Sequence, residues 1–353
     1  MHRPRLGRIP ALPALAGGMV ATLAALEVRR RLDRRAARRD ALWGRLFTPL
    51  DGRPMRVESR DGTGIHVEVF GPEAAPTLVL AHGWTCSLDF WKLQTRELSQ
   101  RFRVVAYDQR GHGRSDRPGR RAYTVEAIAD DFQAVVEGCV PAGERFVAAG
   151  HSMGGMTIAG WAGRHPQEVG RRLAGAVLVS TGMGDLLTQF GLRRPFAGSA
   201  VEKRLTEYLF RVPLGLPPVP NPVTLRALSA LTLGRRASPA VAAFTEQMIL
   251  RCPAPVRAGF GAQFSSLDLY LSVPDLTAPT AVVVGEHDVL TPPWHARKLC
   301  DTLPDCVELV ELPGVGHMAP LEAPEEVTRR IAVMAENCLA SPGLERAAAA
   351  AGR

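Results

Sequence analysis

The sequence predicts an α/β fold in which a mostly parallel sheet carries helices on both faces. Two observations predict this class. Short apolar runs alternate with longer helix-like segments between residues 53 and 180, as is typical of parallel sheets covered by crossover helices. One run, 145–149, leads into Gly150-His151-Ser152-Met153-Gly154, a glycine-flanked serine at a strand-to-helix boundary. The 353 residues, of which 46% are apolar, suffice for one large core and an inserted module.

The expected elements follow one another along the chain in this alternating pattern. We expect strands at 55–59, 64–70, 77–81, 103–107, 145–149, 176–180, 280–285 and 307–312, and helices at 88–99, 124–137, 155–162 and from Pro324 onward. The run at 145–149 is short and apolar, which is typical of a buried strand.

The pentapeptide 150–154 fits a nucleophile elbow, a tight turn that exposes a serine hydroxyl at its apex. A side chain at either glycine is expected to collide with its neighbours. The same five residues also fit an ordinary glycine turn before a helix, so the context must decide between the two.

A serine nucleophile needs a base, and the base needs a carboxylate that orients it. The loop after the run 280–285 contains Asp288, and a glycine-rich loop after the run 307–312 presents His317. Glu286 and Asp185 also follow strand-like runs. We expect a structural role for Glu286 and the start of the next segment at Asp185.

Five motifs together resemble the α/β-hydrolase superfamily over about residues 53–340. In chain order they are His82-Gly83-Trp84, Asp108-Gln109-Arg110-Gly111-His112-Gly113-Arg114-Ser115, the turn at Ser152, Gly285-Glu286-His287-Asp288 and Gly316-His317. The resemblance implies the α/β-hydrolase fold. A serine at the turn points to the esterase- and lipase-like branch, because related dehalogenases and epoxide hydrolases carry aspartate there.

The resemblance also implies a role for each site residue. Ser152 would be the nucleophile, His317 the general base and then the general acid, and Asp288 the group that orients His317. The backbone N–H groups of Met153 and Trp84 would form the oxyanion hole.

The remaining polar residues of these motifs are expected to be structural. His82, His112 and His151 would be hydrogen-bonded histidines, and Asp108 and Arg110 would fix a loop at a strand end. The chain has no C-x-x-C, H-E-x-x-H, G-x-G-x-x-G or G-x-x-x-x-G-K pattern. We therefore expect no metal and no cofactor.

The alternation stops between residues 183 and 276, which contain a proline-rich centre flanked by helical patterns at 201–211 and 239–250. Ser238 would cap the second helix, with Pro239 at its first position. The superfamily inserts its cap at this point. The resemblance therefore implies a helical cap at 183–276, within a core formed by 41–182 and 277–340, and a flexible tail follows at 341–353.

A basic leader is expected at residues 1–40. Residues 1–39 contain ten Arg and two acidic residues, a net charge of +8, which equals that of the whole chain. Residues 40–353 are therefore balanced, which argues against a nucleic-acid partner. Residues 9–26 carry no charge and have Arg on both sides.

Three interpretations of this leader stay open. In the first, residues 9–26 anchor the chain in a membrane, and the basic segment up to residue 39 contacts anionic lipid with the catalytic domain in the cytoplasm. In the second, the leader is a cleaved signal peptide of an exported protein. In the third, it is an amphipathic helix that packs on the body of a soluble cytoplasmic protein or is left disordered. The six cysteines follow no framework pattern, so we expect reduced thiols.

The sequence thus predicts a serine hydrolase acting on esters of apolar acyl groups, a small apolar or lipid-like substrate. A cofactor-free perhydrolase or haloperoxidase-like enzyme stays open, although that group often has proline where this chain has Thr85. Carbon–carbon bond hydrolysis also stays open. The alternative outside catalysis is a ligand-binding receptor on the same scaffold.

Overall fold

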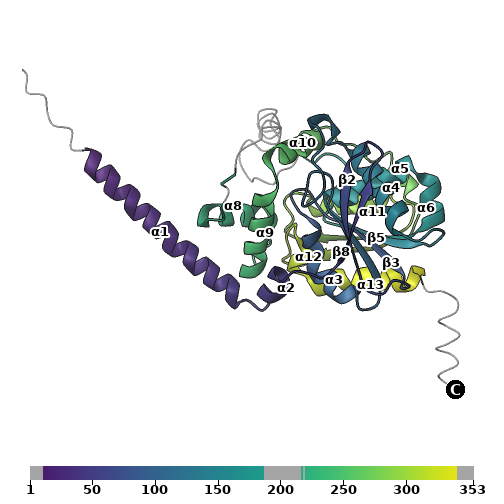
Figure 1. Cartoon of the computed structure of the whole chain (residues 1–353), viewed down its shortest axis with the longest axis horizontal. Coiled ribbons are helices and arrows are strands. Elements are labelled where there is room, and N and C mark those ends of the chain that lie inside the picture. Colours follow the sequence, from purple (N-terminus) through teal and green to yellow (C-terminus); the bar gives the residue numbers. More distant parts are fainter. Residues whose placement is uncertain (1–10, 187–215, 218, 340–353) are drawn as a thin grey trace, which may run out of the picture.

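The computed structural model describes residues 11–186, 216–217 and 219–339, and within them one mixed sheet forms the centre of the molecule (Figure 1). Its strand order is β1-β2-β4-β3-β5-β6-β7-β8. The strands are β1 (Arg53–Glu58), β2 (Gly64–Phe70), β3 (Thr77–Ala81), β4 (Arg103–Tyr107), β5 (Phe146–His151), β6 (Leu173–Val179), β7 (Thr280–Gly285) and β8 (Cys306–Leu312). Strand β2 is antiparallel to both neighbours, and the other adjacent pairs are parallel. The predicted α/β fold is confirmed.

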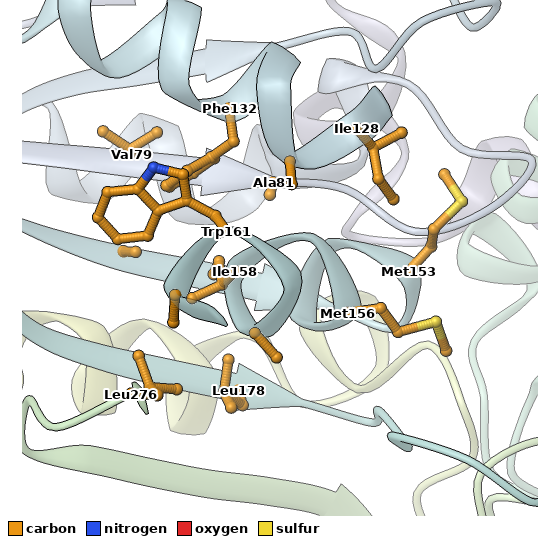
Figure 2. Packing of buried hydrophobic residues seen from close by; sticks show 14 of the residues in the cluster. Val79, Ala81, Ile128, Phe132, Met153, Met156, Ile158, Trp161, Leu178 and Leu276 are labelled. Carbon is orange, nitrogen blue, oxygen red and sulfur yellow. The ribbon is translucent and has the colours of Figure 1, made fainter. Parts of the chain in front are cut away.

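Helices cover both faces of the sheet. On one face lie α4 (Val125–Cys139), α5 (Met153–Arg164), α6 (Pro166–Arg172) and α11 (Pro293–Thr302), and on the other lie α3 (Lys92–Leu98), α12 (Ala319–Glu322) and α13 (Pro324–Leu339). Strand β3 is buried along its whole length: Val79 packs toward the first face and Leu80 toward the second. The first core is shown in Figure 2, where Trp161 of α5 meets Phe132 of α4 edge-on at 5.2 Å between ring centroids.

Four strands, β2, β3, β4 and β7, have the bounds that the apolar runs predict. The helix expected at 88–99 is divided into a 3₁₀ turn, Leu88–Trp91, and α3. The Leu88 N–H donates to the Asp108 carboxylate at 2.8 Å. That bond is made to a residue far along the chain, so the start of this segment is set by tertiary structure.

Between β6 and β7 the described residues form α8 (Pro222–Thr232), α9 (Pro239–Arg251), α10 (Ala254–Phe264) and a 3₁₀ turn at Val273–Asp275. Helix α9 starts as predicted, because the Ser238 hydroxyl accepts from Val241 N at 3.3 Å and Pro239 occupies the first turn. The predicted helix at 201–211 and the tail at 341–353 lie outside the described residues. The cap and the domain boundaries stay predictions.

The described part of the basic leader forms one long helix, α1 (Ala11–Arg39), which is followed by α2 (Trp43–Phe47). Figure 1 shows α1 on the outside of the molecule, with α8 and α9 between it and the sheet. A groove of about 930 Å³ lies between α1 and these two helices. Across the described residues, no helix combines the length and the apolar character that crossing a membrane requires. Residues 9 and 10 of the predicted anchor are not among them.

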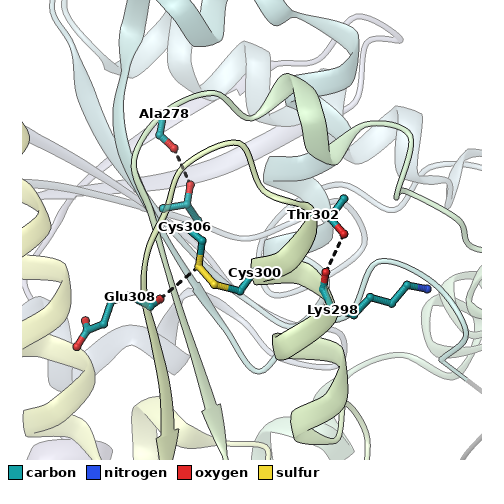
Figure 3. Close-up of a disulfide and its surroundings, with 7 residues drawn as sticks. Ala278, Lys298, Cys300, Thr302, Cys306 and Glu308 are labelled. Carbon is teal, nitrogen blue, oxygen red and sulfur yellow. Dashed lines mark hydrogen bonds between the residues drawn. A yellow bond between two sulfur atoms is a disulfide. The ribbon is translucent and has the colours of Figure 1, made fainter.

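The expectation that all six cysteines are reduced is wrong. Cys300 at the end of α11 and Cys306 at the start of β8 form a disulfide (Figure 3). The chain turns back between them and brings their Cα atoms to 5.3 Å, within the range that a disulfide requires. Cys86, Cys139, Cys252 and Cys338 are free thiols, and the first three are buried as expected.

Candidate active site

The candidate residues lie in loops that follow the carboxyl ends of parallel strands. The loop after β3 contains Trp84, Ser152 follows β5, Asp288 follows β7 and His317 follows β8. Strand β3 lies between β4 and β5 in the sheet. The chain runs from β3 to β4 on one flank of β3 and then crosses to β5 on the other flank. Ser152 thus lies at the point where the strand order reverses, where open α/β sheets commonly bind their ligands.

Ser152 occupies a strained backbone conformation between β5 and α5. Its φ is 52° and its ψ is −117°, a region that costs a non-glycine residue about 1–3 kcal/mol. The end of β6 holds the turn, because Ser152 N donates to the Val179 carbonyl at 2.9 Å and the Thr181 hydroxyl donates to the Ser152 carbonyl at 2.7 Å. These two hydrogen bonds therefore hold Ser152 in a backbone conformation that is unfavourable for a residue outside this turn.

The glycines around Ser152 permit close backbone contacts. A Cβ on Gly154 would lie 2.6 Å from the Ala81 carbonyl carbon, and one on Gly150 would lie 2.6 Å from the Gly154 carbonyl carbon. The predicted collisions at both glycines are therefore confirmed. A Cβ on Gly83 would lie 3.1 Å from Ser152 Cβ, so the loop after β3 passes directly against the serine.

Asp288 and His317 form a buried hydrogen-bonded pair. His317 Nδ1 lies 2.8 Å from Asp288 Oδ2. Asp288 Oδ1 accepts from Leu290 N and Thr291 N at 2.9 Å each, and Oδ2 also accepts from the Thr291 hydroxyl at 2.8 Å. Burial of the Asp288 carboxyl opposes its ionisation. The attraction of a protonated His317 ring and the hydrogen bonds from His317 and Thr291 outweigh burial and hold the pKa of Asp288 below its ordinary value.

The other two carboxylates have different partners. Glu286 accepts from Gly314 N at 2.9 Å, which is the structural role predicted for it. Asp185 is exposed, and its carboxylate lies 3.5 Å from Lys298 Nζ. The carboxylate that is hydrogen-bonded to the His317 ring belongs to Asp288.

The loop that carries His317 is fastened from two sides. The Thr232 carbonyl at the end of α8 accepts from His317 N at 2.9 Å and from Met318 N at 3.2 Å. The Glu322 carboxylate accepts from Gly316 N at 3.1 Å and from Gly234 N at 2.7 Å. Helix α8 and the segment after it therefore help to fix the position of the imidazole.

His151 completes the contacts around this loop. Its Nε2 donates to the His317 carbonyl at 2.9 Å, and the two rings lie 4.9 Å apart. Burial, together with repulsion from a protonated His317 ring, lowers the pKa of His151 to about 3. His151 is therefore a neutral donor beside Ser152, the structural role predicted for it.

Comparison with known protein families decides the classification. A family model described as the alpha/beta hydrolase fold matches residues 76–324. The chain belongs to the α/β-hydrolase family. This confirms the family that the five motifs resemble.

Individual relatives of this α/β hydrolase differ in name and coverage. A bifunctional esterase/perhydrolase of Acinetobacter calcoaceticus is 40% identical over 125 residues, which is 35% of this chain and 43% of that protein. The probable oxidoreductase EphD of Mycobacterium tuberculosis is 29% identical over 287 residues, which is 76% of this chain and 47% of that protein. The chain thus spans less than half the length of both curated relatives. Among solved structures, a thermophilic esterase from Thermogutta terrifontis has a TM-score of 0.64 and 28% identity, and the match covers 81% of this chain and 99% of that one.

The histidines of the first two motifs of the hydrolase are structural, as predicted. His82 Nδ1 donates to the Gly83 carbonyl at 2.7 Å, and its Nε2 accepts from Gln109 N at 3.0 Å. His112 Nε2 accepts from Thr85 N at 3.2 Å. Burial lowers the pKa of His112 to about 4. The two neutral rings join the loops after β3 and β4.

Asp108 and Arg110 fix the loop after β4, which is also as predicted. Arg110 is fully buried, and its Nε and Nη2 donate to the two oxygens of Asp131 at 2.7 Å each. Asp108 accepts from Leu88 N at 2.8 Å and from Arg114 N at 3.0 Å. Burial raises the pKa of Asp108 to about 6, and the bonds from Arg114 N and Leu88 N oppose this shift because they favour the ionised carboxylate.

The oxyanion-hole roles of Met153 and Trp84 stay predictions. Met153 is the first residue of α5, where helix N–H groups have no partner within the helix. Trp84 directly follows Gly83, which lies against Ser152, and its indole meets Phe264 of α10 edge-on at 5.2 Å.

Sequence reasoning missed several supporting residues. Part of the signal was present, because an aspartate in a loop commonly accepts backbone N–H groups of the residues that follow it, as Asp288 does from Leu290 and Thr291. Thr232 acts through its backbone carbonyl, for which residue type gives no signal.

Proposed function

We propose that this α/β hydrolase is a serine esterase that cleaves carboxylic esters of apolar acyl groups through Ser152, His317 and Asp288. The observation that carries the proposal is the 2.8 Å hydrogen bond from His317 Nδ1 to Asp288, in a loop that is bonded to His151, the residue before the serine held at φ 52°. Ser152 follows β5 and the pair follows β7 and β8, with β6 between them, so all three residues lie at the carboxyl edge of the same sheet.

The proposed mechanism follows from the proton positions. Because Nδ1–H is donated to Asp288, the lone pair of His317 lies on Nε2, which takes the Ser152 proton as Oγ attacks the ester carbonyl. The oxyanion of the tetrahedral intermediate accepts from the N–H groups of Met153 and Trp84. His317 then protonates the departing alcohol. Water attacks the acyl-enzyme by the same route and restores Ser152, so the reaction uses no cofactor and no metal.

The preference for apolar acyl groups is proposed from the side chains near the oxyanion loop. Trp84 lies against Phe264, and Phe260 of the same helix lies 5.6 Å from the His112 ring. Met153 and Met156 at the start of α5 are buried in the same core. An acyl chain that packs against these side chains would be transferred from water to an apolar surface, which favours its binding.

Perhydrolysis is the second candidate, since one relative is named an esterase/perhydrolase. The Thr85 backbone favours ester hydrolysis. Its φ is 62° and its N–H donates to His112 Nε2, whereas proline has φ near −65° and no N–H. The loop of this chain therefore differs from one with proline at that position.

The experiment compares the two reactions in the full chain. We expect hydrolysis of p-nitrophenyl esters of increasing acyl length and much slower formation of peracetic acid from acetate and hydrogen peroxide. Ser152→Ala should lower kcat by at least about 10³-fold, whereas Ser99→Ala, at the end of α3, should have wild-type activity. Turnover that persists in Ser152→Ala, or ligand binding without any turnover, would overturn the proposal.

A further inference from the structure

The outward surface of α1 is not used by the proposed reaction. Val28, Arg31, Leu32, Arg35 and Arg39 are spaced three or four residues apart or adjacent, so they share one side of the helix. We call them the α1 outer face. Val28 is 57% exposed and Leu32 is 50% exposed, and the three arginines are exposed as well.

The opposite side of α1 is fastened to the molecule. Ala37 is 1% exposed, and Asp33 accepts from both terminal nitrogens of Arg226 on α8 at 3.1 and 3.2 Å. Asp40, just after α1, accepts from Ala240 N in the first turn of α9 at 3.1 Å. Figure 1 shows α1 outside α8 and α9, and the residues of the α1 outer face lie across the helix from buried Ala37 and are exposed.

The net positive charge of the chain comes from the segment that contains α1. Residues 1–39 carry a net charge of +8, and residues 40–353 are neutral overall. Glu27 pairs with Arg30 and Arg31, and Asp33 pairs with Arg29 as well as Arg226. No carboxylate of the described residues lies within ion-pair distance of Arg35 or Arg39. These guanidinium groups are therefore available to an anionic partner.

We infer that the α1 outer face docks on the surface of an anionic lipid bilayer. Val28 and Leu32 would enter the interface, and Arg31, Arg35 and Arg39 would reach lipid phosphates beside them. Nucleic acid would attract the same arginines, but its backbone offers no apolar phase for two exposed aliphatic side chains. The inference is independent of the proposed esterase activity, because it uses neither Ser152 nor the ester substrate.

The role of the arginines is tested by a sedimentation assay, which measures binding of the full chain to two kinds of lipid vesicle. One is phosphatidylcholine alone, and the other contains about 30% phosphatidylglycerol. We expect binding to the anionic vesicles only, and Arg31→Gln/Arg35→Gln/Arg39→Gln should weaken it by a factor on the order of 100. The matched control, Arg53→Gln/Arg60→Gln/Arg297→Gln, removes the same charge from other exposed positions and should bind like the wild type.

The aliphatic side chains are tested in the same assay. Val28→Ser/Leu32→Ser should weaken binding to anionic vesicles by about 10-fold. Leu271→Ser/Val307→Ser is the control, since these side chains are 90% and 53% exposed elsewhere. Equal binding to both vesicles, equal loss in variant and control, or tighter binding to duplex DNA than to anionic vesicles would each overturn the inference. Ester hydrolysis in detergent-free buffer shows whether each variant is folded. If the wild-type chain proves inactive, circular dichroism is used for this control instead.

Discussion

Thr291 shows how single side chains hold the proposed catalytic pair. Its hydroxyl donates to Asp288 Oδ2, and its N–H donates to Oδ1 of the same carboxylate. Asp288 therefore has a fixed orientation in which Oδ2 faces His317. A carboxylate free to rotate would hold the imidazole less well.

Replacing Thr291 with valine removes the hydroxyl and keeps the shape. A hydrogen bond to a charged group is worth about 1.5–3 kcal/mol, so we expect kcat for p-nitrophenyl esters to fall by about 10- to 100-fold with little change in KM. Thr291→Ser should retain most of the activity, because it keeps the donor. An unchanged kcat in Thr291→Val, measured by steady-state kinetics, would show that Asp288 needs no such support.

The pairing of Asp288 with His317 could be predicted from the order of residues, but its surroundings could not. Asp288 and His317 each follow an apolar run, and both runs became neighbouring parallel strands, β7 and β8. The bond from His317 N to the Thr232 carbonyl joins residues from separate parts of the chain. No pattern of residue types specifies such a backbone contact.

The turn between β5 and α5 depends on the approach of α5 to the end of β3. Gly154→Ala would place a Cβ 2.6 Å from the Ala81 carbonyl carbon, and backbone atoms cannot yield as a flexible side chain does. We expect the free energy of unfolding to fall by about 2–3 kcal/mol and ester hydrolysis to fall with it. Chemical denaturation measures the first quantity.

Gly170→Ala on α6 is the control for this substitution. A Cβ there has no neighbour within 4 Å, and alanine favours a helix over glycine by up to about 1 kcal/mol. This variant should be at least as stable as the wild type. If Gly154→Ala were equally stable, the close packing of α5 on β3 would not be what fixes the turn.

Strands buried on both faces were the easiest elements to predict. The runs at β3, β4 and β7 are short and mostly apolar, and β2 alternates apolar residues with His66 and Glu68. The 3₁₀ turn at Leu88–Trp91 was missed because a bond to Asp108 defines it. The Cys300–Cys306 disulfide was missed because cysteine count and spacing do not report where α11 turns back into β8.

Buried neutral histidines make the stability of the whole molecule depend on pH. The pKa of His112 is about 4 in the folded protein, against an ordinary value of about 6.5. Between these values the unfolded chain binds a proton that the folded protein does not. Stability from this group is therefore complete above about pH 6.5 and is lost as the pH falls toward 4.

His112→Gln should remove this group's contribution to the change of the unfolding free energy with pH. We expect the variant to be less stable at pH 7, because the bond to Thr85 is disturbed, but to lose less stability on acidification. The difference should approach about 1.4 kcal/mol per pH unit between pH 6 and 4.5. Denaturant unfolding at a series of pH values measures both slopes, and parallel slopes would show that His112 is protonated in the folded protein.

The central claim for the whole molecule is that this α/β hydrolase presents Ser152 as a nucleophile activated by His317. The most direct test is reaction of the full chain with a fluorophosphonate, followed by peptide mapping by mass spectrometry. The account predicts one modified serine, Ser152, with labelling absent in Ser152→Ala and slowed by at least about 10²-fold in His317→Ala. No labelling, labelling of another serine, or an undiminished rate in His317→Ala would contradict it.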